Sequence, residues 1–146
     1  MISAELAQRL KQAGLQWLPS ERDFFMIPGH QLDNQVFVLS QFTGLVQLVN
    51  GNPVISFHGT TEWALDYILL AETVWLPSET QLRELIVFMI GTDAPMRLDR
   101  TPAGYRCQIA VRERMLEFDA AAAEDAYAQA LIYLLQGQQG PTVKTA

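Results

Sequence analysis

The N-terminal residues carry apolar side chains at helical spacing. Leu6, Leu10 and Ala13 fall on one face of a helix, and most positions between them are polar. Ser3 is a favourable N-cap, and Gly14 is well placed to end the helix. The pattern therefore predicts an amphipathic first helix between these two residues.

Short apolar runs bounded by turn residues follow the first helix. Residues 23–27, 35–39 and 53–57 are rich in β-branched, aromatic and other large apolar side chains. Glycine, proline and asparagine separate these runs, which is typical of turns between strands. We expect three short strands here. Residues 41–50 fit either a strand or a short helix, so their pattern leaves that element open.

The segment from Gly59 or Thr60 to Ala71 is apolar almost all round. Glu62 and Asp66, four residues apart, supply its only charged stripe. A helix with so narrow a polar face is usually buried in a protein core. We therefore predict a largely buried helix here, capped by the glycine or threonine at its start.

A second cap marks the next helix. Ser78 and Gln81 have the spacing of a capping box, and Gly91 is placed to end the helix. Residues 75–77 before it are expected to form an extended connector. The apolar face of this helix comprises Leu82, Leu85, Ile86 and Met89.

The last third of the chain predicts an antiparallel β unit followed by a helix. Residues 96–100, 105–111 and 114–118 alternate in the manner of strands and are separated by turn residues. Asp119 is a plausible N-cap for an alanine-rich helix that continues to Gln136. Its small side chains suit close packing on a sheet.

These elements predict an α+β fold with a mostly antiparallel sheet packed against three or four helices. The helices do not alternate with strands at the regular spacing of a nucleotide-binding fold. A chain of 146 residues fits one domain. We expect that domain to span residues 1–137, with a disordered tail over residues 138–146.

The charges are distributed unevenly along the chain. Residues 23–82 contain six acids and neither lysine nor arginine, so they account for the whole net charge of −6. Such a surface repels phosphate and anionic lipid, which argues against nucleic acid or membrane as a partner. Charged residues make up only 18% of the chain, which favours apolar surface left for a protein partner.

The remaining composition excludes several kinds of chemistry. One cysteine, Cys107, allows neither an internal disulfide nor a thiolate zinc site, and its strand-like surroundings predict a buried thiol. The sequence has no glycine-rich phosphate loop, Gly-x-Ser-x-Gly or His-Glu-x-x-His motif. We therefore predict no catalytic residue and no cofactor. The N-terminus has no continuous apolar segment, so we expect a cytoplasmic protein.

One constellation could bind a metal. His58, Glu62 and Asp66 are spaced by four residues, and a histidine with two carboxylates suits zinc, iron or manganese. The alignment requires the helix to begin at His58, whereas Gly59 favours a later start. Alternatively, the two acids form the solvated edge of a buried helix and the histidine forms hydrogen bonds locally.

Half of the basic residues lie between positions 97 and 114, in the predicted hairpin. A solvated sheet face, a nucleic-acid surface and an electrostatic docking surface would all fit this cluster, although the net negative charge argues against nucleic acid. The tryptophans could be core residues or interface anchors. The candidate interface residues are Trp63, Trp75, Arg97, Arg106 and Arg112.

Three stretches resemble small bacterial and phage-encoded proteins of unknown function. They are residues 5–14, residues 75–85, and Phe118 and Asp119 together with residues 126–135. The shared features are helix caps and apolar stripes, so the resemblance implies a common structural pattern and no activity.

The sequence favours a non-enzymatic, cytoplasmic protein–protein interaction or scaffolding domain that forms a homodimer. Low charge and two strongly apolar segments, residues 64–71 and 85–90, support this interpretation. The alternative is a small-molecule- or metal-binding module that uses His58 with Glu62 and Asp66.

Overall fold

A computed structural model describes most of the chain. The described residues are 1–29, 31–40, 44–57 and 67–138. They fall into two compact units. The first combines residues 1–15 with the chain from Pro77 onward, and the second spans residues 16–76. The prediction of one domain over residues 1–137 stays a prediction, and most of the expected tail lies outside the described residues.

The fold is mixed α+β, and within the described residues every strand pairing is antiparallel, as the sequence predicts. The packing differs in detail from the expected single sheet. The described strands form three separate three-stranded sheets, and three α-helices accompany them.

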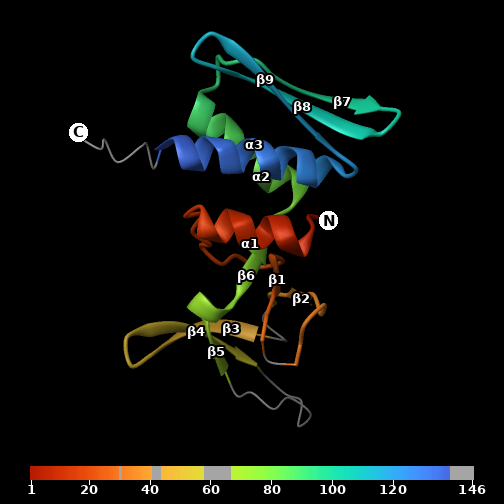
Figure 1. Cartoon of the computed structure of the whole chain (residues 1–146). Helices are drawn as coiled ribbons and strands as arrows, with labels where there is room; N and C mark the ends of the chain where they lie inside the picture. Colours follow the sequence, from red (N-terminus) through yellow and green to blue (C-terminus); the bar gives the residue numbers. More distant parts are fainter. Residues whose placement is uncertain (30, 41–43, 58–66, 139–146) are drawn as a thin grey trace, which may run out of the picture. The chain divides into compact units, whose positions relative to one another are not determined.

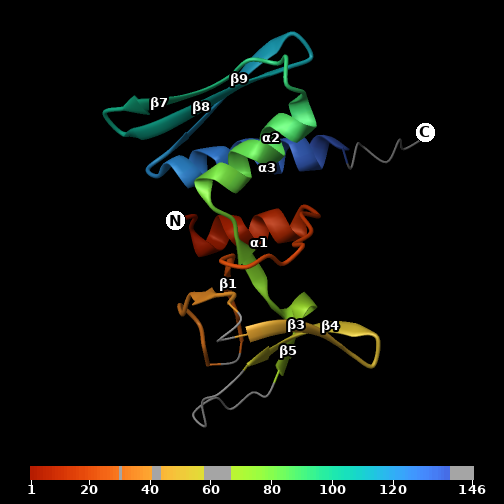
Figure 2. The same ribbon diagram turned by 180° about the vertical axis from the view of Figure 1, so that it is seen from behind.

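The first unit contains all three helices and one sheet. Its elements are α1 (Ala4–Gln12), α2 (Glu79–Ile90), β7 (Met96–Thr101), β8 (Gly104–Val111), β9 (Arg114–Ala120) and α3 (Ala123–Gln138). Figure 1 shows this unit as layers, with α3 beneath the sheet and α1 on the opposite side of α3. Helix α2 packs alongside α3, and Figure 2 shows it from behind, in front of α3.

The sheet of the first unit has order β7-β8-β9, with an apolar face toward α3 and a polar face on the other side. Cys107 and Ile109 of the central strand are fully buried. The register pairs Asp99 with Arg106 and Arg106 with Asp119, so these three charged residues share the polar face. This alternation is typical of an antiparallel sheet that is solvated on one side.

Helix α3 is the central packing element of the first unit. Ala126, Ala128 and Ala130 are fully buried, because α1, α2 and the sheet all contact this helix. Small side chains allow such close approach of backbones. Near the C-terminal half of the helix, the rings of Tyr133 and Phe118 lie 5.9 Å apart and extend the contact to β9.

The predicted helix caps at Ser3, Ser78–Gln81 and Gly91 are confirmed. The Ser3 hydroxyl accepts a hydrogen bond from the Leu6 N–H, and α1 begins at the next residue after the cap. Ser78 and Gln81 form both hydrogen bonds of the capping box at the start of α2. Gly91 ends α2 with a φ of 94°, a conformation that glycine adopts without strain.

The second unit contains two small sheets and no α-helix within its described residues. The elements are β1 (Phe24–Met26), β2 (Phe37–Val38), β3 (Gly44–Val49), β4 (Asn52–Phe57), β5 (Tyr67–Leu69), a 3₁₀ turn η1 (Leu70–Glu72) and β6 (Val74–Leu76). The sheets have orders β2-β1-β6 and β3-β4-β5. Residues from both sheets form one core, made of Phe25, Ile27, Leu39, Ile55 and Ile68.

Two of the predicted helices need correction. Residues 67–71, predicted to end a helix, form β5 and the start of η1, because Ile68 pairs with Ile55 of the neighbouring strand. The rest of that predicted helix, residues 59–66, lies outside the described residues. Asp119 is not an N-cap: β9 continues through Ala120, and α3 begins only at Ala123.

The ambiguous segment and the connector both contain strands. Residues 44–49 form β3, which pairs along its whole length with β4. The expected connector overlaps β6, whose residue Trp75 pairs with Phe25 of β1. β4 follows β3 directly along the chain, whereas β1 is distant from β6 in sequence, so only the second of these pairings is long-range.

Candidate functional site

The three residues predicted to bind a metal all lie outside the described part of the chain. His58, Glu62 and Asp66 lie outside the described residues, as does Trp63. Within the part of the chain that the structure describes, no group of three histidine, cysteine or acidic side chains could hold a metal ion. The metal-binding alternative therefore stays a prediction.

The central arginine of the hairpin is held by acids of its own sheet. Arg106 Nε donates to Asp119 Oδ1 at 2.7 Å, and its terminal nitrogen donates to Asp119 Oδ2 at 3.1 Å. Glu117 lies 3.6 Å from the same guanidinium. The hydrogen bonds from Arg106 lower the pKa of Asp119, and those bonds raise the pKa of Arg106 in turn.

The other candidate arginines occupy the edge and a turn of the same sheet. Arg97 Nε donates to Asp99 Oδ1 at 2.7 Å on the polar face of β7, and 69% of the Arg97 side chain is exposed. Arg112 lies in the β8–β9 turn with a φ of 50°. The polar face of the three strands therefore carries three acids and two arginines, and a phosphate backbone would find no net positive charge there.

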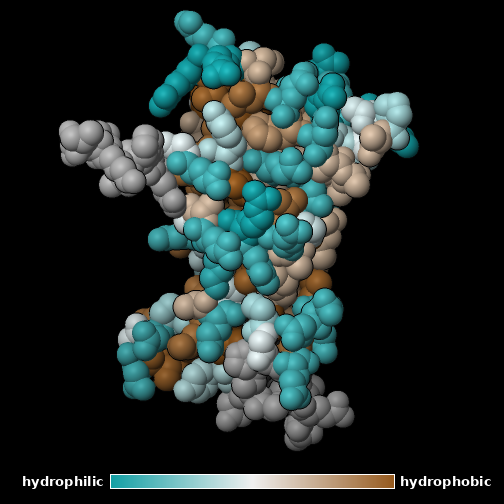
Figure 3. Space-filling view, in the orientation of Figure 1, coloured by the Kyte–Doolittle hydropathy of each residue, from teal (hydrophilic) through white to brown (hydrophobic). Residues whose placement is uncertain are grey.

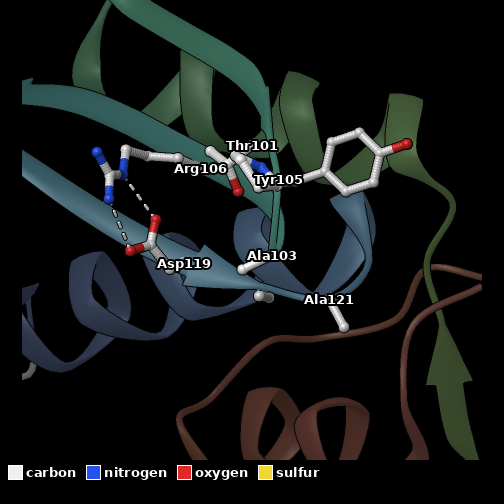
Figure 4. Close-up of a pocket in the computed structure, with 8 residues that line it drawn as sticks. Thr101, Ala103, Tyr105, Arg106, Asp119 and Ala121 are labelled. Atoms are coloured by element: carbon white, nitrogen blue, oxygen red, sulfur yellow. Dashed lines mark hydrogen bonds and ion pairs between the residues drawn. The ribbon is translucent and has the colours of Figure 1, made fainter.

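A shallow pocket of about 450 Å³ lies at one end of this sheet. Figure 4 shows the Arg106–Asp119 ion pair on one side of the pocket and Tyr105 on the other. A side chain at Gly104 would collide with the Ala120 carbonyl, so the close approach of these strands requires glycine. The residues that line the pocket include neither histidine nor cysteine.

The cysteine of the chain is not a reactive group. Cys107 is fully buried in β8, and burial raises the pKa of its thiol to about 11. At neutral pH the thiol is therefore protonated and poorly nucleophilic. This agrees with the buried thiol that the sequence predicts.

Two tryptophans contribute to the second unit. The Trp17 indole N–H donates to Asp23 at 2.9 Å, and its ring lies 5.4 Å from that of Phe25. Trp75 is partly buried in β6, and its indole N–H has no hydrogen-bond partner among the described residues. Both residues take part in the packing around β1.

The C-terminal half of α2 exposes an apolar surface. Residues 85–90 are all apolar, yet only Ile86 among them is buried. Phe88 is 87% exposed, which makes it the most exposed large apolar residue of the described chain. In Figure 3, hydrophobic side chains gather beneath the sheet of the first unit, where this half of α2 emerges. We call residues 85–90 the apolar half of α2.

An open sheet edge belongs to the same unit. β7 pairs with β8 on one side, and none of the described strands pairs with its other side. Sequence reasoning identified the apolar half of α2 but missed this edge. The charge order Arg97-Leu98-Asp99 is visible in the sequence, but the strand order that places β7 at an edge is not.

No protein-family model, curated protein or solved structure matches this chain. Among the described residues, none of the helices is both long and apolar enough to cross a membrane. Functional inference therefore rests on the surface of the chain itself.

Proposed function

We propose that this chain is a non-enzymatic, cytoplasmic protein–protein interaction domain that works as a homodimer. The observation that carries the proposal is the apolar half of α2, with Phe88 87% exposed. Contiguous exposed apolar residues on a small domain commonly mark an interaction surface. Helix α2 packs on α3, so this surface is presented by a fixed element.

The energetics favour association through this surface. Burying one phenylalanine side chain contributes about 1.5–3 kcal/mol, and a symmetric dimer buries two copies. The side chains beside Phe88 in α2 include Leu85 and Met89, both partly exposed already. Residues 85–90 include no charged residue, so burying them in an interface removes no ionised side chain of this segment from water.

The experiment replaces the exposed ring by a charge. Phe88→Glu should weaken dimerisation at least about a hundredfold, because it removes two buried rings and places two carboxylates in an apolar contact. Sedimentation velocity across a concentration series measures the dissociation constant. Leu18→Glu is the matched control, because Leu18 is 84% exposed in the other unit.

The outcomes separate clearly. Dimerisation lost in the Phe88 variant and retained in the Leu18 variant supports the proposed surface. A wild-type chain that stays monomeric at micromolar concentration contradicts the homodimer. Equal melting temperatures for the two variants and the wild type, measured at a concentration low enough that all three are monomeric, would show that the effect concerns association rather than folding.

A further inference from the structure

The open edge of β7 has a definite set of outward-facing backbone groups. The Pro95 carbonyl accepts a hydrogen bond from the Ala110 N–H at 3.1 Å, so position 95 faces β8. Backbone groups alternate in direction along an antiparallel strand. The N–H and C=O groups of Met96, Leu98 and Arg100 therefore point away from β8, toward the open edge.

The side chains on this edge are self-complementary in charge. Arg97 and Asp99 share the polar face of β7, on either side of Leu98, whose side chain lies on the opposite face. We propose that β7 pairs antiparallel with β7 of a second copy about a two-fold axis at Leu98. Arg97 of each copy then lies opposite Asp99 of the other, and the two sheets form one six-stranded sheet.

Charge selects this register over its neighbours. In an antiparallel pair of strands, directly opposed residues point their side chains to the same face of the sheet. The two-fold axis between two copies of β7 must therefore pass through a residue, and alternative registers differ by whole-residue shifts of this axis. An axis at Arg97 places two guanidinium groups directly opposite each other, and an axis at Asp99 does the same with two carboxylates. Like charges directly opposite are destabilising, whereas opposite charges stabilise the pair.

The other edge of the sheet lacks this property. The polar face of β9 carries Glu117 and Asp119, which are both acidic. An axis at either residue sets an acid against its own copy, and an axis at Phe118 sets Glu117 against Asp119. Because this face of β9 carries no basic residue, no register of β9 self-pairing sets an acid opposite a base. We infer that β7 is the pairing edge.

One of the two prolines that flank β7, Pro102, limits the pairing. Pro95 has no N–H, but the groups at position 95 face β8, so the open edge loses no donor there. The groups at position 102 face outward, and Pro102 supplies no donor at that point. The pairing therefore spans Met96 to Arg100, and each facing pair can exchange two hydrogen bonds.

This inference rests on the proposed homodimer and gives it a geometry. Helix α3 contacts β8 and β9, and α2 packs against α3 before the chain continues into β7. The apolar half of α2 thus leads directly to the pairing strand. In the proposed antiparallel pair, the two α2 helices lead into opposite ends of the joined β7 strands, so their exposed apolar residues flank the new junction.

A charge exchange tests the register. Arg97→Asp and Asp99→Arg should each raise the dimer dissociation constant about tenfold, because each creates two like-charge pairs per dimer. The double variant carrying both changes restores opposite charges and should return the constant to within about threefold of wild type. Arg114→Asp, outside β7, is the matched control and should leave the constant unchanged.

Cross-linking tests the position of the axis. Leu98→Cys places two thiols on residues whose Cα atoms are about 5.5 Å apart, within the range of a disulfide, so mild oxidation should link the dimer. Arg100→Cys is the control on the same face. Its two copies would lie about 13 Å apart, which is too far for a disulfide. Cys107 is buried and gives no competing product.

The results distinguish the two proposals. Recovery of dimerisation in the double variant, with cross-linking at position 98 alone, establishes the β7 register. If the dimer dissociation constant depends on Phe88 but does not change in the charge variants, the β7 register is wrong and the homodimer is still supported. Equal cross-linking at positions 98 and 100 would contradict the register in the same way. A wild-type monomer overturns both.

Discussion

At the scale of single residues, the charges of the polar sheet face are compensated across strands. Arg106 lies between Asp99 and Asp119 in the register and forms its hydrogen bonds with Asp119. Isolated exposed ion pairs contribute little to stability. Each arginine of this face has an acidic neighbour on its own sheet, so we expect these pairs to influence which strand register a second copy adopts rather than the stability of one copy. The exposed Arg97–Asp99 pair at the edge can exchange partners with a second copy.

The Arg106–Asp119 ion pair makes a prediction about pH. Because Arg106 lowers the pKa of Asp119, the charged carboxylate favours the folded state above the ordinary aspartate pKa. That contribution disappears as the pH falls through the lowered value. Arg106→Gln should raise the pKa of Asp119 toward its ordinary value, as measured by NMR titration of the side-chain carboxyl carbon.

The control for this titration is Arg97→Gln, which removes a guanidinium that pairs with Asp99 instead. It should leave the pKa of Asp119 in place. An Asp119 pKa that is equal in wild type and Arg106→Gln would show that the ion pair does not persist in solution.

At the scale of elements, local signals were sufficient wherever the determining contacts are local. The Ser3 cap and the Ser78–Gln81 box involve residues three positions apart, and both were predicted. Residues 67–71 were predicted as helix because their apolar pattern is equally compatible with a buried strand. Their pairing with β4 is contributed by distant residues, which periodicity alone does not reveal.

The same distinction applies to the candidate site. The apolar run at residues 85–90 was visible in the sequence, and its exposure follows from which face of α2 packs on α3. The open edge of β7 could not be predicted, because strand order decides which strand lies outside. The extension of β9 through Asp119 likewise depends on pairing with Arg106.

The capping box makes a prediction at the element scale. Ser78→Ala removes the acceptor for the Gln81 N–H and should lower the free energy of unfolding by about 1 kcal/mol. Chemical denaturation measures this change. The control is Thr80→Ala, at the exposed second residue of α2. It should change the free energy of unfolding by less than about 0.5 kcal/mol. An unchanged stability for Ser78→Ala would contradict the observed cap.

At the scale of the whole molecule, the two units share a chain but differ in charge. The second unit, residues 16–76, contains six acidic residues, one arginine (Arg22) and no lysine. The first unit carries balanced charges, an exposed apolar helix half and an open sheet edge. The features that favour self-association therefore belong to the first unit.

The most direct test of the central claim is the mass of the untagged wild-type protein in solution. Sedimentation equilibrium across the micromolar range should give twice the chain mass of 16.4 kDa at the upper concentrations. It should also show reversible dissociation on dilution. A mass of one chain at every concentration would contradict the homodimer and the interface proposed for it.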